Sequence, residues 1–116
     1  MTTAYKLVKA PRKASWEGEG TAGAGGVVTS YAKLVSRFGK PFGKSVDKKV
    51  DAEWVLRTKV GGTPIVVTIY NYKDGKAYNG PSGLPLSKIR NWHIGGSIGK
   101  GITGAKIVAI VKAALK

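Results

Sequence analysis

The sequence predicts a single α+β domain over residues 1–116, with an antiparallel sheet of about four strands packed against two helices in the order β-α-β-β-β-α. Three observations carry this prediction. Residues 50–58 alternate apolar and polar side chains, and residues 63–72 are rich in Val, Ile, Thr and Tyr, as half-buried and buried strands are. Residues 29–38 and 103–115 repeat apolar side chains at helical spacing. A chain of 116 residues has room for one core.

The N-terminal region is expected to hold a short strand followed by a long loop. Residues 5–10 read as the first strand, and Pro11 ends it. Residues of about 11–28 are rich in glycine and lack periodicity, which predicts a flexible loop. Trp16 lies in this loop, where it is either a residue that stacks on a base or a lid on the core.

The first helix is predicted over residues 29–38, with Thr29 or Ser30 as its N-cap. Gly39 and Pro41 end it. Its apolar face contains Tyr31, Leu34, Val35 and Phe38.

A β-hairpin is expected next. One face of its first strand is apolar and consists of Val50, Ala52, Trp54 and Leu56. The pair Gly61-Gly62 is a tight-turn signal that joins this strand to residues 63–72. An irregular loop over residues 75–88, a short strand over 89–94 and the C-terminal helix over 103–115 complete the domain.

The charge predicts an anionic partner. The sequence contains twenty Lys and Arg residues and six Asp and Glu residues, which gives a net charge of +14. Solubility alone needs a net charge of only about 2–8 in magnitude in a small domain. The chain has no cysteine, no apolar run near the ~20 residues of a membrane span and no apolar signal-peptide core. We therefore expect a cytoplasmic protein without membrane contact.

The ligand is predicted to bear a phosphate. The segment 89–104 combines a strand, five glycines and a helix start, where free N–H groups and the helix dipole attract anions. Aromatic side chains at the end of a strand, next to lysines, can stack on the bases of a nucleotide or nucleic acid. A flexible connector with ordinary helix capping is the alternative interpretation. The predicted ligand-binding residues are Tyr70, Tyr72, Lys73, Arg90, Trp92, His93, Gly95, Gly96, Ser97, Lys100 and Thr103. Trp16 and Trp54 are predicted as stacking or lid residues.

Several classes of site are disfavoured. The motif Gly99 to Gly104 fits G-x-G-x-x-G, but no second strand and no acidic residue follow it, as a dinucleotide-binding unit requires. His93 has no companion at metal-ligand spacing. Among the six carboxylates, Asp51 and Glu53 share a strand face, with Arg57 as an evident salt-bridge partner. We predict no catalytic residue, no metal and no cofactor.

Four short motifs resemble a family of small proteins encoded by tailed bacteriophages, across about residues 30–96. They are Phe38-Gly39-Lys40-Pro41, Lys49-Val50-Asp51-Ala52-Glu53-Trp54, Ile69-Tyr70-Asn71-Tyr72-Lys73 and Trp92-His93-Ile94-Gly95-Gly96. The resemblance implies a phage accessory protein and no specific chemistry. Our first hypothesis is a non-enzymatic protein of the infected host cell that sequesters a nucleotide immune signal. The alternatives are a basic protein that binds DNA or RNA, and an inhibitor that docks on an acidic host protein. A homo-oligomer is left open.

Overall fold

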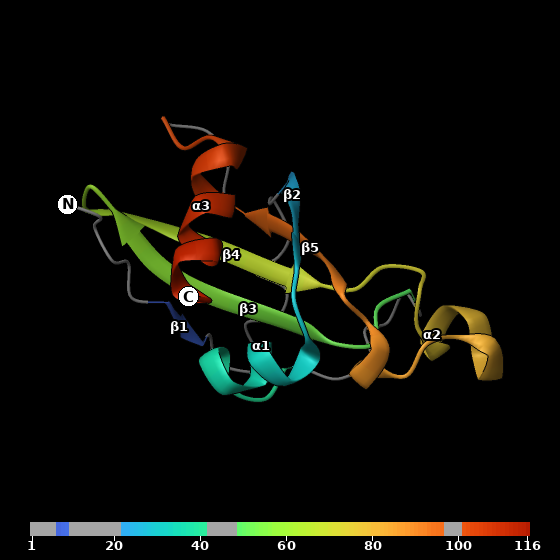
Figure 1. Cartoon of the computed structure of the whole chain (residues 1–116). Coiled ribbons are helices and arrows are strands. Elements are labelled where there is room, and N and C mark those ends of the chain that lie inside the picture. Colours follow the sequence, from blue (N-terminus) through green and yellow to red (C-terminus); the bar gives the residue numbers. More distant parts are fainter. Residues whose placement is uncertain (1–6, 10–21, 42–48, 97–100) are drawn as a thin grey trace.

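The computed structural model describes residues 7–9, 22–41, 49–96 and 101–116. These residues form one antiparallel sheet and three helices, an α+β arrangement as predicted (Figure 1). The elements in chain order are β1 (Val8–Lys9), β2 (Ala22–Val28), α1 (Tyr31–Phe38), β3 (Glu53–Val60), β4 (Thr63–Tyr70), α2 (Lys76–Asn79), β5 (Asn91–Gly96) and α3 (Gly104–Ala114). Two 3-10 turns, Gly80–Ser82 and Leu86–Lys88, lie between α2 and β5.

The sheet has five strands in the order β1-β3-β4-β5-β2, and every neighbouring pair is antiparallel. The predicted hairpin is confirmed. Val60 pairs with Thr63 across Gly61 and Gly62, whose positive φ angles of 55° and 82° suit a two-residue turn. β1 contributes only two residues, opposite Leu56 and Arg57.

The prediction of a flexible loop is wrong for residues 22–28, which form the edge strand β2 along β5. Glycine has a low intrinsic preference for strands, but here β5 supplies hydrogen-bonding partners and α3 packs on the strand. A Cβ atom on Gly25 would lie 2.9 Å from a methyl group of Val108. The missing side chain therefore lets α3 approach. The rest of the predicted loop, residues 11–21, lies outside the described residues.

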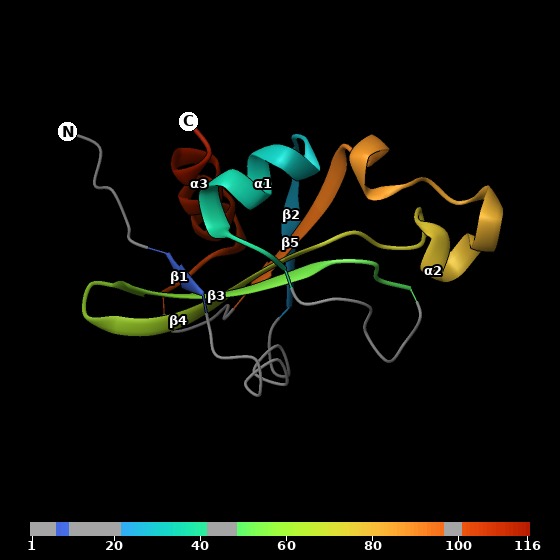
Figure 2. The same cartoon turned by 90° about the horizontal axis from the view of Figure 1, so that it is seen from below.

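The helices α1 and α3 cover one face of the sheet, and the core lies between them and the strands (Figures 1 and 2). The fully buried side chains there include Leu34, Trp54, Leu56, Ile69, Trp92, Ile94 and Ile107. Ser30 caps α1 by accepting a hydrogen bond from the Lys33 N–H, and Gly39 ends the helix at φ 81°. The predicted amphipathic helix is thus confirmed. No described helix is both long enough and apolar enough to cross a membrane.

Gly96 marks the closest approach of α3 to the sheet. A Cβ atom there would lie 2.7 Å from Ile107 Cδ1 and 2.8 Å from the carbonyl oxygen of Val66. The Ile107 side chain can move, but the backbone of β4 cannot move without disturbing its pairing. Gly96→Ala is therefore expected to lower the free energy of unfolding by about 1–3 kcal/mol, measured by urea denaturation. The matched control Gly23→Ala, where a Cβ would meet nothing within 4 Å, is expected to change it by less than about 0.5 kcal/mol.

Candidate functional site

Three aromatic side chains meet on the sheet face opposite α1 and α3. Tyr70 of β4 and His93 of β5 are register partners, and their rings stack with centroids 5.6 Å apart and planes 17° apart. Tyr72, just beyond β4, meets the edge of the His93 ring at 5.9 Å. His93 and Tyr72 are exposed, and Tyr70 is half-buried. Exposed rings of this kind offer faces on which a planar base can stack.

Lys73 joins this group through two cation–π contacts. Its ammonium lies 5.2 Å from the ring centroid of Tyr72 and 5.5 Å from that of Tyr78, which belongs to α2. Such contacts hold the charge beside the rings. We name Tyr70, Tyr72, Lys73, Tyr78 and His93 the aromatic–cation cluster.

Lys73 also has an unusual backbone. Its φ of 63° makes it the one non-glycine residue of the described chain with a positive φ. Its N–H donates to the carbonyl of Lys49, and its own carbonyl accepts from the Asn79 side chain. A left-handed conformation costs an ordinary residue roughly 1–2 kcal/mol. Costs of this size concentrate at functional sites, where surrounding contacts hold the conformation.

The fully buried Asn71 side chain fixes the segment that carries Tyr72 and Lys73. Its Oδ1 accepts from the N–H groups of Asp51 (2.7 Å) and Ala52 (3.1 Å). Its Nδ2 donates to the carboxylates of Asp51 and Asp74, both at 2.9 Å. Asp51 in turn accepts from the N–H of Ala77, in the first turn of α2. One amide thus ties the chain before β3 to the chain after β4.

The surroundings of Tyr70 disfavour its ionised form. Burial raises the pKa of the Tyr70 hydroxyl above its usual value of 10.0, and the nearby charges of Glu53 and then Tyr72 raise this pKa further. The phenol is therefore protonated at physiological pH. It presents a neutral ring and a hydroxyl that can donate a hydrogen bond.

Two side chains in the middle of this sheet face are buried. They are Val55 and Thr68, at 0% and 3% exposed. Arg57 and Lys59 are exposed toward the opposite end of β3. Among the described residues of this face, the exposed aromatic side chains lie at the end formed by the cluster.

The expected role of Trp54 as a stacking or lid residue and that of Trp92 as a ligand-binding residue do not fit the structure. Both indoles are in the core, at 0% and 1% exposed, and they meet edge to face at 5.5 Å with Tyr31 beside them. Trp54 Nε1–H donates to the Gly39 carbonyl and Trp92 Nε1–H to the Thr29 carbonyl. Their polar atoms are therefore used inside the protein.

The predicted glycine loop is also placed differently. Gly95 and Gly96 belong to β5 and pair with β4 on one side and β2 on the other, so their backbone groups face strands rather than an anion. Thr103 is the N-cap of α3 and accepts from the Lys106 N–H. Arg90 is exposed, lies just before β5 and takes no part in the ring and cation–π contacts that define the cluster. Ser97, Lys100 and Trp16 lie outside the described residues.

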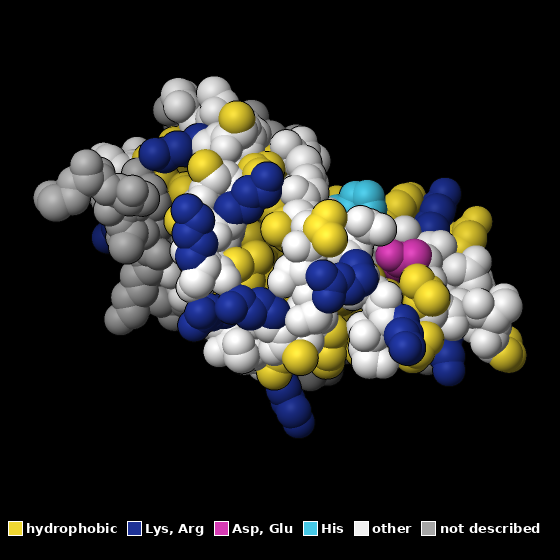
Figure 3. All heavy atoms as spheres, in the orientation of Figure 1, with side chains coloured by type: hydrophobic (Ala, Val, Ile, Leu, Met, Phe, Trp, Pro, Cys, Tyr) yellow, Lys and Arg dark blue, Asp and Glu magenta, His cyan; other side chains and the backbone are white. Residues whose placement is uncertain are grey.

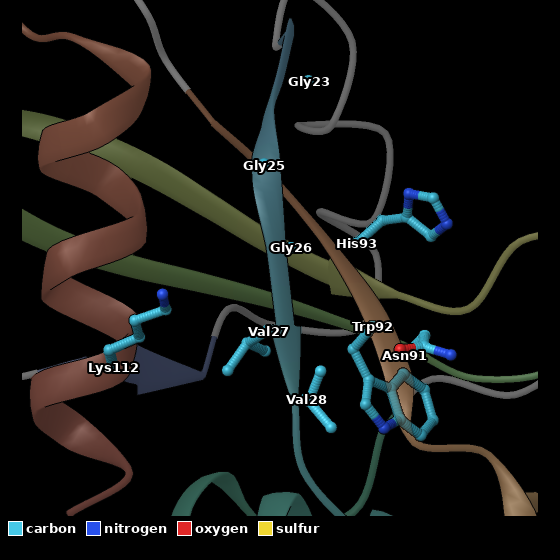
Figure 4. Close-up of a pocket in the computed structure, with 9 residues that line it drawn as sticks. All are labelled: Gly23, Gly25, Gly26, Val27, Val28, Asn91, Trp92, His93 and Lys112. Atoms are coloured by element: carbon cyan, nitrogen blue, oxygen red, sulfur yellow. The ribbon is translucent and has the colours of Figure 1, made fainter.

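A groove of about 910 Å³ runs along β2 and was not predicted. Figure 4 shows β2 crossing between Lys112 of α3 on one side and Asn91 and His93 of β5 on the other. The sequence analysis also missed Tyr78, because α2 has four residues and no periodicity. Its only sequence signal was its place among glycines after Asp74-Gly75.

The described residues hold no group of three His, Cys, Asp or Glu side chains that could bind a metal ion. No family model, no curated protein and no solved structure matches the chain.

Proposed function

We propose that this protein binds single-stranded nucleic acid and stacks bases on the aromatic–cation cluster. The observation that supports this most is the placement of Lys73 between two tyrosine rings beside the Tyr70–His93 stack. Single strands are bound by such combinations, in which rings stack on bases and cations contact phosphates.

The distribution of charge favours a polymer over a single nucleotide. Among the described residues the carboxylates are Asp51, Glu53 and Asp74, and two of them bind Asn71. The cations, in contrast, lie on many elements. Figure 3 shows them scattered over the face that carries α1 and α3. Exposed examples are Arg37, Lys40, Arg57, Lys59, Lys73, Lys76, Lys88, Arg90, Lys106, Lys112 and Lys116.

The shape of the cluster points the same way. A site for a small molecule usually encloses 70–90% of its ligand's surface, whereas Tyr72 and Tyr78 are exposed, at 39% and 51%. An open platform gains affinity when a polymer adds phosphate contacts elsewhere. Sequestration of a free nucleotide stays a prediction, as does a role in phage infection.

The test is fluorescence anisotropy with a labelled oligothymidylate of about 15 nucleotides. We expect the single strand to bind more tightly than a duplex of equal length. Affinity should fall steeply between about 50 and 200 mM salt, with a logarithmic slope near 0.7 per phosphate contacted. Free thymidine monophosphate should compete poorly. Equal competition by the monophosphate would favour a nucleotide-binding site instead, and no binding at low salt would reject both.

Lys73→Gly should separate stability from binding. Glycine adopts a φ of 63° without steric cost, so we expect the free energy of unfolding to rise by up to about 1 kcal/mol. Loss of the ammonium should weaken oligonucleotide binding by roughly 3- to 10-fold. Lys88→Ala removes the same charge in the 3-10 turn before β5 and should weaken binding less. Equal losses in the two variants would show that only total charge matters.

A further inference from the structure

The edge strand β2 exposes backbone hydrogen-bonding groups. In the described part of the chain, β2 pairs only with β5. The N–H of Thr29 donates to the carbonyl of Arg90 at 2.9 Å, next to the pair Val28 and Asn91. Because bonded and non-bonded pairs alternate in antiparallel sheets, the N–H and C=O groups of Val28 and Gly26 point away from β5. These groups form an open edge.

Within the described residues, only the first half of this edge has one of the usual protections against a further strand, a register shift. Ala22–Val28 contains no charged residue and no proline, which are the common means of blocking an edge. The register shift between Gly23 and Gly25 interrupts its first half, so the regular edge runs from Gly26 to Thr29. Gly26 is exposed, and a Cβ atom there would lie 3.0 Å from the carbonyl oxygen of Trp92, so its missing side chain serves the pairing with β5.

Side chains around the edge indicate the kind of strand it suits. Val28 is 68% exposed, more than any other large hydrophobic residue of the described chain. Among the described residues, those that line the groove beside it include Lys112 and His93 and no carboxylate (Figure 4). An added strand would thus meet the apolar side chain of Val28, the positive charge of Lys112 and the imidazole of His93. Alternating apolar and acidic side chains are complementary to these groups.

The charge argues against a second copy of the chain as the occupant. Each copy carries +14, and pairing two β2 edges would bring both Lys112 side chains together. We propose that β2 is a docking edge for an extended acidic segment of a partner protein, which adds to the sheet as a sixth strand beside Gly26–Thr29. This surface is separate from the aromatic–cation cluster except for His93, and the proposal does not depend on nucleic-acid binding.

The probe is a capped peptide of alternating Glu and Val, titrated into the full ¹⁵N-labelled chain. Backbone pairing should protect the amides of Gly26 and Val28 from hydrogen exchange by about tenfold or more, while Val27, already paired with Trp92, should change little. A peptide of Glu and Gly carries the same charge with low strand preference, and it should bind more weakly. An alternating Lys and Val peptide should not bind.

Val28→Pro and Val28→Thr form the matched variants. Proline removes the outward N–H without breaking a bond to β5, as edge strands tolerate, and should weaken peptide binding by roughly tenfold. Threonine keeps the N–H and the β-branched shape and should weaken it by less than about threefold. Oligonucleotide binding should be unchanged in both. If Val28→Pro does not fold, the hydrogen-exchange pattern of the unmodified chain with bound peptide tests the proposal by itself.

Four results would overturn the proposal. These are unchanged protection of Gly26 and Val28 with bound peptide, peptide shifts centred on Tyr72, protection of both amides by oligothymidylate, and a dimer in sedimentation whose contacts map to β2. The first two reject the docking edge, the third assigns the edge to nucleic acid, and the fourth assigns it to self-association.

Discussion

Asn71→Ala is expected to lower the free energy of unfolding by roughly 3–5 kcal/mol, since it leaves several buried or partly buried groups without partners at once. The N–H groups of Asp51 and Ala52 lose their acceptor, and the carboxylates of Asp51 and Asp74 lose a donor. The side chain is 0% exposed, so water cannot replace it without opening the structure. A loss of this size is a large part of the 5–15 kcal/mol that typical domains have.

Urea denaturation measures this change, and Asn79→Ala is its control. Asn79 also donates from its amide to two backbone carbonyls, those of Lys73 and Gly75, but its side chain is exposed. Asn79→Ala should therefore lower the free energy of unfolding by about 1 kcal/mol or less. Equal losses for the two variants would mean that Asn71 does not hold the segment between β4 and α2.

Tyr72→Ala is expected to weaken oligothymidylate binding by roughly 5- to 150-fold, the range that corresponds to 1–3 kcal/mol for one base stack. Tyr72 offers the most accessible ring next to the Tyr70–His93 stack, and it holds one of the two contacts to the Lys73 ammonium. Its removal thus takes away a stacking surface and one of the two contacts that position the Lys73 ammonium. The slope of affinity against salt should change little, because no charge is removed.

Tyr72→Phe and Val28→Ala are the controls for this prediction. Phenylalanine keeps the ring and should retain affinity to within about threefold. Val28 is equally a surface side chain, at 68% exposed, but it lies on β2, so its truncation should leave oligonucleotide affinity unchanged. A Tyr72→Ala variant that binds like the original chain would show that the rings do not take part.

Side-chain periodicity predicted the elements that bury an alternating or helical face. The hairpin of β3 and β4 and the helix α1 follow from apolar spacing with glycine at the turn and at the helix end. β2 could not be predicted this way, because Ala-Gly-Ala-Gly-Gly has no side-chain pattern and forms a strand only against β5 and α3. α2 likewise depends on Asp51, which is distant in sequence.

The residues of the candidate site also divide into those that a sequence pattern predicted and those that it did not. Tyr70, Tyr72, Lys73 and His93 were predicted as one group because the strands that carry them were recognised, and their side chains lie together in the structure. Trp92 was placed wrongly at the surface, although it alternates with Ile94 and so shares the apolar face. The contact of Lys73 with Tyr78 and the positive φ of Lys73 arise from folding of the segment around Asn71. No local pattern encodes them.

The most direct test of the proposed function is an NMR titration of the ¹⁵N-labelled chain with oligothymidylate at low salt. We predict that the largest amide shifts fall on Tyr70, Tyr72, Lys73, Tyr78 and His93, and that Lys73→Gly reduces them. Shifts that are spread evenly over the exposed lysines of α1 and α3, with the cluster unchanged, would contradict base stacking there and leave only charge-driven association.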